Sequence, residues 1–330
     1  MKQNPESLET LDTEIQKLLT LRAAMVCRQA GVAENPLPEE SLEAIFRDIH
    51  SVCRQLVAPT KVAFLGPLYS YSHLALMRYF GSGPTLAPVT TIDAVFEEVS
   101  RKQADFGVVP VENSTDGRVV DALESFMRTP ANICGEVEIP IHHALLAVCP
   151  REEIAEVHSK PQVLSQCRHW IAKHLPGVRV VEAPSSADAA RTAQQKPGVA
   201  AISNEYAAKV YGLNILADAI EDNPHNRTRF VILGGQSTKK TGRDKTTLML
   251  ELPHHPGSLA DVMTIFKKKH LNLTWIESFP IPESSRTYLF FIDFEGHQTE
   301  LRVRQTLEML RKKTVRVEVL GSYAQAEVEK

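Results

Sequence analysis

Short apolar runs that alternate with helical segments constrain the fold of this chain more than any other feature. Lys61–Leu65 stops at Gly66-Pro67, and Phe106–Val109 stops at Pro110. Such runs are typical of buried strands, and each precedes a polar loop and a stretch of helical periodicity. Residues 156–211 repeat the order of strand, loop and helix. These repeats predict an α/β fold with parallel sheets, in two lobes with a cleft between them.

Polar side chains gather where the expected strands end. Asn113 and Ser114 follow the second strand just before a helix, where backbone N–H groups favour an anion. Thr228 lies between Arg227 and Arg229, at the entry of an apolar run. Taken singly, each loop also fits an ordinary helix cap or strand entry. Because loops after parallel strands converge at one edge of a sheet, together they predict a site for a small anion.

The two ends of the chain have different patterns. The first 59 residues have helical periodicity on both sides of Pro36 and Pro38, which break the helix. Two amphipathic helices cannot bury their apolar stripes alone, so this segment is expected to pack on the rest of the chain or on a second copy. From Thr246 to Leu320 the pattern predicts strand, helix, strand, strand, helix, strand, a ferredoxin-like βαββαβ order. The basic residues between Lys239 and Lys245 are expected to be solvated.

Length and composition exclude several classes of protein. The 330 residues suffice for two or three domains, and a net charge of −3 does not favour nucleic-acid binding. The five cysteines are odd in number and widely spaced, which argues against a disulfide framework or a zinc site. No apolar run approaches the ~20 residues of a membrane span, so we expect no membrane partner and a cytoplasmic protein.

Three segments of the middle region resemble the motifs of prephenate dehydratases. Pro110–Gly117 is similar to their Val-Glu-Asn-Ser-x-x-Gly motif. Asn226–Phe230 contains their Thr-Arg-Phe signature, and Ser159–Cys167 resembles their Ser-His-Pro-Gln segment. Tyr69 and Ser70 stand where the family usually has Gly-Thr. The resemblance implies a two-lobed, periplasmic-binding-protein-like dehydratase domain at residues 60–237.

The resemblance also implies the chemistry, which is the loss of water and CO2 from prephenate to give phenylpyruvate. Thr228 would be the general acid, Arg229 would hold a carboxylate, and Glu112 and Asn113 complete the expected catalytic group. The expected substrate-binding residues are Ser114, Ser159, Gln166 and Ser70. Lys160 stands where the family often has histidine and adds a cation. No metal or organic cofactor is implied.

The flanking segments resemble two further domains. Residues 1–59 are similar to the chorismate mutase domain of bacterial bifunctional enzymes; Arg22 matches an active-site arginine, but the other cations have no counterpart. We expect this domain to be degenerate and used for dimerisation. Residues 245–322 resemble a phenylalanine-binding ACT domain, although Phe279 stands where the family usually has arginine. Its expected effector residues are Gly257, Ser258, Leu259, Glu277 and Ser278.

The leading hypothesis is therefore a prephenate dehydratase of phenylalanine biosynthesis, a homodimer or higher homo-oligomer, with L-phenylalanine as effector. One alternative is an arogenate dehydratase, whose substrate carries an amino group in place of the keto oxygen. A second is a bifunctional enzyme that retains mutase activity. A third is a non-catalytic amino-acid sensor, which retention of Thr228 and Arg229 argues against.

Overall fold

The computed structural model describes residues 7–33, 35–235, 238–280 and 288–326. The chain divides into two compact units, one of Met1–Pro59 with Phe80–Pro84 and one of Thr60–Tyr79 with Thr85–Lys330. None of the helices described is long and apolar enough to cross a membrane.

The first unit contains two long helices, α1 (Leu8–Ala30) and α2 (Glu39–Val57). His50 Nε2 lies 3.2 Å from Asp12 Oδ2 and links them. No described residue of α1 is buried, and its apolar side chains are largely exposed, as are Leu56 and Val57 of α2. The apolar stripes that the sequence predicts are therefore left without cover among the described residues of this unit.

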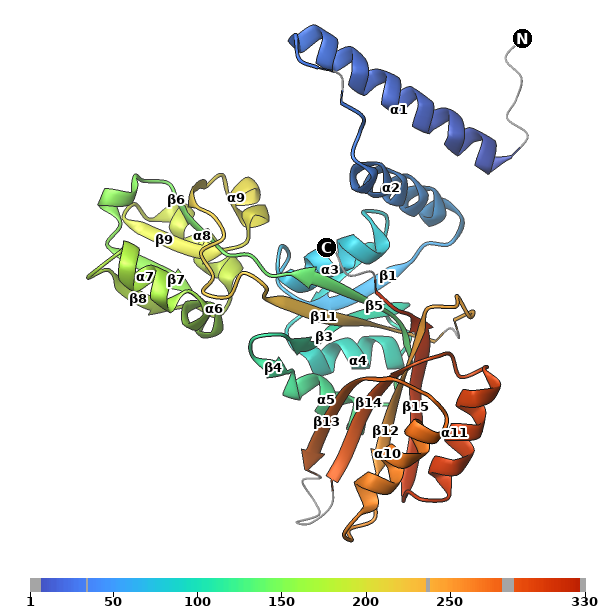
Figure 1. Cartoon of the computed structure of the whole chain (residues 1–330). Helices are drawn as coiled ribbons and strands as arrows, with labels where there is room; N and C mark the ends of the chain where they lie inside the picture. Colours follow the sequence, from blue (N-terminus) through green and yellow to red (C-terminus); the bar gives the residue numbers. More distant parts are fainter. Residues whose placement is uncertain (1–6, 34, 236–237, 281–287, 327–330) are drawn as a thin grey trace. The chain divides into compact units, whose positions relative to one another are not determined.

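The second unit begins with a six-stranded sheet in which β1 pairs in parallel with β2 and β3, and β11 pairs antiparallel with β3 and β5 (Figure 1). The strand order is β2-β1-β3-β11-β5, with β4 beside β3. The strands are β1 (Lys61–Leu65), β2 (Thr85–Val89), β3 (Phe106–Asn113), β4 (Gly117–Arg118), β5 (Ile133–Pro140) and β11 (Arg227–Gly234). The helices of this lobe are α3 (Tyr71–Phe80), α4 (Ile92–Ser100) and α5 (Val120–Arg128).

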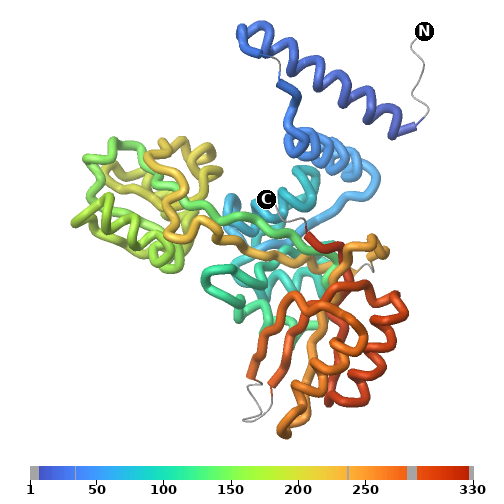
Figure 2. Tube along the Cα trace, viewed as in Figure 1, coloured from blue at the N-terminus to red at the C-terminus, as the bar shows by residue number. Residues whose placement is uncertain are grey.

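A second lobe is built on a five-stranded sheet of order β10-β6-β9-β7-β8. Its strands are β6 (Ala144–Ala147), β7 (Glu156–Ser159), β8 (Arg179–Glu182), β9 (Val199–Ser203) and β10 (Asn214–Ala217). Its helices are α6 (Pro161–Gln166), α7 (Arg168–His174), α8 (Ser186–Gln195) and α9 (Glu205–Tyr211), with a short 3-10 turn at Arg151–Glu153. The chain passes between the two sheets twice, after β5 and before β11 (Figure 2). The predicted two-lobed α/β architecture is confirmed.

The C-terminal part of this unit has the element order strand, helix, strand, strand, helix, strand. The elements are β12 (Asp244–Glu251), α10 (Ser258–Lys268), β13 (Leu273–Pro280), β14 (Tyr288–Glu295), α11 (Leu301–Arg311) and β15 (Arg316–Ala324). The strands form one sheet of order β13-β14-β12-β15, and α10 and α11 cover one of its faces (Figure 1). We call it the C-terminal sheet.

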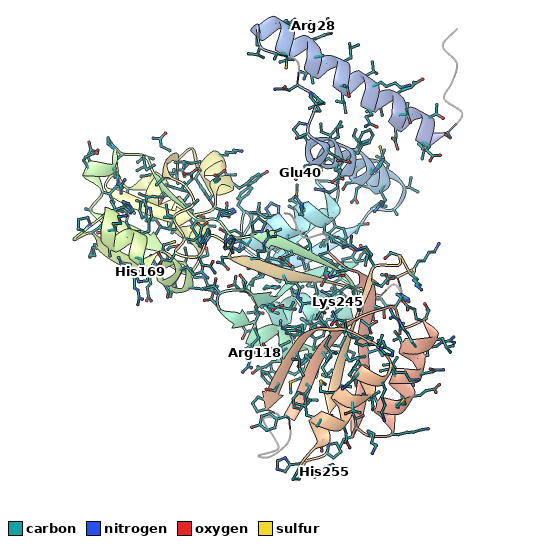
Figure 3. The ribbon with its side chains drawn as sticks, viewed as in Figure 1. Arg28, Glu40, Arg118, His169, Lys245 and His255 are labelled. Atoms are coloured by element: carbon teal, nitrogen blue, oxygen red, sulfur yellow. The ribbon has the colours of Figure 1, made fainter. Side chains whose placement is uncertain are left out.

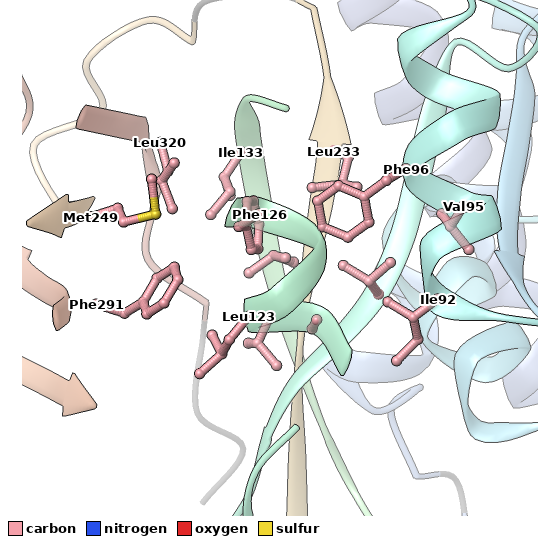
Figure 4. Close-up of a cluster of buried hydrophobic side chains, with 14 of the residues drawn as sticks. Ile92, Val95, Phe96, Leu123, Phe126, Ile133, Leu233, Met249, Phe291 and Leu320 are labelled. Carbon is pink, nitrogen blue, oxygen red and sulfur yellow. The ribbon is translucent and has the colours of Figure 1, made fainter. Parts of the chain in front are cut away.

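Strand β12 of the C-terminal sheet is buried on both of its faces. Leu248 and Leu250 of β12 belong to the core beneath α10 and α11. Met249, between them, belongs to a different cluster with Phe126 and Ile133 of the first lobe (Figure 4). Because successive strand residues point to opposite faces, burial of both faces explains why β12 is a continuous apolar run. The C-terminal sheet thus shares a hydrophobic core with the first lobe.

Four strands, β2, β4, β5 and β10, are absent from the sequence prediction. The most consequential is β5, where Gly135 and the carboxylates of Glu136 and Glu138 interrupt the apolar pattern. Glu136 is nonetheless buried, because Lys245 Nζ lies 2.8 Å from its Oε1. The expectation that Lys245 is solvated is therefore wrong, since only 7% of this residue is exposed.

Candidate active site

A cleft of about 470 Å³ lies between the two lobes, among the loops that follow the strands. The loop after β1 contributes Ser70, the end of β3 contributes Asn113, and the start of β11 contributes Thr228. The second lobe adds Gln166 from α6. The structure therefore brings together four of the predicted site residues from four separate segments.

Thr228 is held so that its hydroxyl proton remains available. Asn113 Nδ2 donates a hydrogen bond of 2.8 Å to Thr228 Oγ1, while Asn113 Oδ1 accepts from the backbone N–H groups of Thr115 and Asp116. These contacts fix which end of the Asn113 amide faces Thr228. Since Oγ1 accepts from Asn113, its own O–H is free to donate to a group in the cleft. Thr228 is only 8% exposed, so this donor is largely shielded from bulk solvent.

Arg229 does not line the cleft with its two neighbours in the sequence. Thr228 and Phe230 are cleft residues, whereas Arg229 points to the opposite face of the sheet, as strand alternation requires. There its Nε lies 3.1 Å from Glu112 Oε2, so Glu112 also faces away from the cleft. Arg229 therefore faces away from the cleft in which the sequence analysis expected it to hold a carboxylate of the substrate.

Two of the expected substrate-binding serines support loops instead of lining the cleft. Ser159 is fully buried and donates a 2.6 Å hydrogen bond to the carbonyl of Ile202. Ser114 Oγ accepts a 2.9 Å hydrogen bond from the backbone N–H of Arg227 and so ties the loop after β3 to the start of β11. Both residues therefore position the walls of the cleft.

The cleft also contains His143, which the sequence analysis did not select. His143 is 1% exposed, and its Nε2 lies 2.9 Å from Gln166 Oε1. Gln166 Nε2 donates to Asp116 Oδ2 at 2.7 Å, so its Oε1 is the end of the amide that accepts a hydrogen bond from His143 Nε2. Burial lowers the pKa of His143, so the neutral ring with hydrogen on Nε2 fits this chain of contacts. A lone histidine at the start of an apolar run carries no signal that could have distinguished it in the sequence.

Two cations lie among the cleft residues. Lys160 precedes α6, and its Nζ has no ion pair with any residue that the structure describes. Arg118 of β4, labelled in Figure 3, is engaged, because its Nη1 lies 3.1 Å from Glu277 Oε2 of β13. Lys160 is thus the cation most available to an anionic ligand.

Tyr69, in the loop after β1, forms part of the cleft wall in an unusual backbone conformation. Its φ of 68° lies in the left-handed region that favours glycine. The ring packs against His73, Tyr206 and Tyr211, at centroid distances of 5.5, 5.8 and 6.5 Å. Asn204 Nδ2 donates to the Tyr69 carbonyl at 2.9 Å, so this residue connects the two lobes.

The residues expected to bind an effector fall into two places. Ser258 and Leu259, at the start of α10, line a separate pocket of about 400 Å³ with His254, His255 and Tyr288. Gly257 immediately precedes them with a φ of 91°. Glu277 and Ser278 lie instead on β13. There Arg118 Nη1 donates hydrogen bonds to the side chain of Glu277 and to the backbone carbonyl of Ser278. The structure does not bring these two groups together.

Within the described ranges, no three His, Cys, Asp or Glu side chains are grouped so that they could hold a metal ion. A two-lobed α/β domain whose interlobe cleft offers a free hydroxyl proton, neutral amides and an unpaired lysine defines an enzyme-like binder of small organic anions.

Comparisons with known proteins identify the family. Residues 62–238 match the family model of prephenate dehydratase, and the chain belongs to that family. A Pseudomonas aeruginosa protein named bifunctional chorismate mutase/prephenate dehydratase is 41% identical over 295 residues, covering 89% of this chain and 81% of that protein. A protein of the same name from Neisseria gonorrhoeae is 36% identical over 346 residues, covering 97% of this chain and 96% of that protein.

A solved structure agrees with this assignment. The prephenate dehydratase from Arthrobacter aurescens, in complex with L-Phe, superposes with a TM-score of 0.74 at 34% identity. The match covers 80% of this chain and 90% of that one. The motif-based assignment from the sequence is thereby confirmed, and it places the chain among lyases.

Proposed function

We propose that this chain converts prephenate to phenylpyruvate by dehydration and decarboxylation. The observation that carries the proposal is the hydroxyl of Thr228, which accepts from Asn113 and keeps its own proton free within the cleft. The leaving group of prephenate is a ring hydroxyl, which departs poorly unless it is protonated or strongly hydrogen-bonded. A single well-placed donor matches that requirement.

The electron flow in the proposed reaction needs no cofactor. Cleavage of the bond to the ring carboxylate releases CO2, and its electron pair moves into the ring and expels the hydroxyl. Thr228 donates its proton to the departing oxygen, which leaves as water, and solvent returns a proton to Thr228. Because formation of the aromatic ring drives the reaction, the protein mainly has to position the substrate and the donor.

The other cleft residues are proposed to hold the substrate. Lys160 is the cation suited to a carboxylate, and the second N–H of the Gln166 amide can donate to that carboxylate or to the keto oxygen. Ser70 Oγ donates to the Leu65 carbonyl at 3.0 Å and accepts from the backbone N–H of His73, so its remaining lone pair can only accept, as from the ring hydroxyl of prephenate. The remaining predicted residues act indirectly, by supporting the loops and strands that carry the cleft residues. They are Ser114, Ser159, Glu112 and Arg229.

The test compares two substitutions at Thr228. Thr228→Val keeps the shape but removes the O–H, whereas Thr228→Ser keeps the O–H. We expect release of phenylpyruvate from prephenate to fall by about 10²–10⁴-fold in kcat for valine and far less for serine. Thermal unfolding controls for folding, since losing one acceptor of Asn113 costs only about 1 kcal/mol. Equal rates for valine and the wild type would remove Thr228 from the mechanism.

Arogenate is the second substrate to be assayed. It replaces the keto oxygen of prephenate with an ammonium group, so its charge is less negative. Lys160 has no ion-pair partner among the residues described, which favours the more anionic prephenate. A higher kcat/KM for arogenate in the same assay would reverse this preference.

Residues 1–59 are proposed to be a degenerate mutase-like domain that contributes to a homodimer or higher oligomer. The exposed apolar side chains of α1 support association, and Arg22 is the only cation of the family site matched in the sequence. Relatives named bifunctional chorismate mutase/prephenate dehydratase make the activity worth measuring. Conversion of chorismate to prephenate by the full chain would contradict the proposal.

Residues 245–322 are proposed to be an ACT domain that takes L-phenylalanine as effector of the dehydratase at residues 60–237. The pocket beside Ser258 and Leu259 has room for an amino acid, and its lining is mostly apolar. The Arthrobacter aurescens protein was solved with L-Phe, which supports the same ligand class here. As an enzyme of amino-acid biosynthesis, the protein would act in the cytoplasm. Inhibition of prephenate turnover by phenylalanine tests the proposal.

A further inference from the structure

Arg229 points away from the cleft into a buried cluster of charges. Its Nη1 lies 2.7 Å from Asp293 Oδ2 of β14 and 3.3 Å from Glu136 Oε2 of β5, and its Nε contacts Glu112 of β3. Arg229 is 8% exposed, and Asp293 is fully buried. One guanidinium therefore joins β11 to two strands of its own sheet and to the C-terminal sheet.

All four strands of the C-terminal sheet contribute a side chain to this cluster. Lys245 of β12, labelled in Figure 3, holds the carboxylate of Glu136, with Nζ at 2.8 and 2.9 Å from its two oxygens. Trp275 of β13 stacks on Arg229, whose Cζ lies 4.8 Å from the ring centroid. Asp293 comes from β14, and Tyr323 comes from β15.

The position of Asp293 is itself tightly determined. Thr247 Oγ1 donates a 2.7 Å hydrogen bond to Asp293 Oδ1 and lies 2.6 Å from the hydroxyl of Tyr323. Because Thr247 has one proton and gives it to Asp293, Tyr323 is the donor to Thr247. One oxygen of Asp293 is thus held by its own sheet while the other holds Arg229.

The pKa shifts of Arg229 and Glu136 favour their charged forms. Burial alone would lower the pKa of Arg229, but the carboxylates of Asp293, Glu136 and Glu112 outweigh it and raise the pKa. Burial would raise the pKa of Glu136, but Lys245 and Arg229 hold it below its ordinary value. Buried charges of this kind are costly unless every one is paired, so the arrangement resists displacement of any single member.

We propose that Arg229 is a positioning residue, through which the C-terminal sheet holds the strand that carries Thr228. Thr228 and Arg229 are consecutive on β11, so a shift of one backbone position carries the other. Small misplacements of a catalytic donor cost large factors in rate, and Asp293 is therefore required for full turnover although it lies outside the cleft. A ligand that displaces the C-terminal sheet acts on Thr228 through the same contacts. The inference rests on the proposed dehydratase function.

The test uses variants of the full-length chain assayed with prephenate. Asp293→Asn removes the ion pair, Asp293→Glu restores the charge, and Thr247→Val keeps every charge but frees Asp293. Glu318→Gln is the matched control, because it neutralises a carboxylate of the same sheet whose ion-pair partner among the described residues is the exposed Arg316. In Asp293→Asn we expect kcat to fall about tenfold or more while KM stays within about twofold of the wild type. Thr247→Val should show a smaller fall in kcat, and Asp293→Glu should recover kcat. Glu318→Gln should match the wild type.

Phenylalanine supplies a second readout. If the wild type is inhibited, Asp293→Asn should bind phenylalanine in calorimetry yet lose about fivefold or more of its inhibition. Should Asp293→Asn fail to fold, Thr247→Val decides the matter, since it leaves no buried charge unpaired. Variants with raised KM and unchanged kcat would overturn the inference, as would variants that match Glu318→Gln in every readout. An inactive wild type would refute the proposed function itself.

Discussion

Replacing Tyr69 with glycine and with alanine separates the two opposing effects at that position. At a φ of 68°, a side chain costs roughly 1 kcal/mol that glycine avoids. Against this, the ring of Tyr69 makes three aromatic contacts, each worth about 0.5 kcal/mol at a half-buried site. Loss of apolar burial adds roughly 0.5 kcal/mol. The ring therefore contributes about 2 kcal/mol, which exceeds the strain.

These magnitudes predict an order of stabilities. Tyr69→Ala loses the ring and keeps the strain, so the free energy of unfolding should fall by about 2 kcal/mol. Tyr69→Gly loses the ring but relieves the strain, so the fall should be about 1 kcal/mol. Urea unfolding measures both, followed by the fluorescence of Trp170 in the second lobe. Because the ring contacts Tyr206 and Tyr211 in that lobe, KM for prephenate should rise in both variants.

Lys102 provides a control without packing. Its φ is 57° and its side chain is exposed, so Lys102→Gly should be about 1 kcal/mol more stable than Lys102→Ala, with neither affecting KM. If Tyr69→Ala proves as stable as Tyr69→Gly while the Lys102 pair behaves as expected, the backbone at Tyr69 is not strained and the reasoning is refuted.

Two further predictions concern the docking of the C-terminal sheet and the charge of the cleft. A Cβ at Gly321 would overlap the carbonyl oxygen of Ile133, so Gly321→Ala should lower the free energy of unfolding by about 3 kcal/mol. Gly235→Ala is the control, because a Cβ there meets open space and should leave the free energy of unfolding unchanged. Equal urea midpoints for the two variants would contradict the packing argument. Lys160→Gln should raise KM for prephenate about tenfold with little change in kcat, because the cation is expected to bind ground and transition states alike. Lys173→Gln, on α7 outside the cleft, is its control in steady-state kinetics, and an unchanged KM in Lys160→Gln would remove the lysine from substrate binding.

The sequence was sufficient to predict the two-lobed α/β architecture and the convergence of Asn113 and Thr228. Both predictions rest on short-range patterns, namely apolar runs of strand length and polar residues where those runs end. Ser159 carries the same local signal, yet in the structure it is buried and hydrogen-bonded to the carbonyl of Ile202. A loop serine that supports a wall and one that lines it cannot be told apart without the packing around them.

The charges of the buried cluster were misjudged for a related reason. Glu136 and Lys245 each resemble a solvated residue in their own segment, and only their pairing, across 109 positions of the chain, allows both to be buried. Strand β5 was missed in the sequence because its own carboxylates break the apolar pattern on which strand prediction depends. Long-range pairing of opposite charges leaves no trace in local periodicity.

The Thr-Arg-Phe signature can now be understood from the geometry of one strand. In a strand with a two-residue period, Thr228 and Phe230 face the cleft, and the residue between them must face the other side. On that side β11 meets the C-terminal sheet, where a planar guanidinium with five N–H donors can bind carboxylates from three strands at once. Lysine at this position would offer one compact charge and could not span Glu112, Glu136 and Asp293 together. Arg229 is therefore suited to holding β11 against the C-terminal sheet, and Thr228 beside it is suited to donating a proton in the cleft.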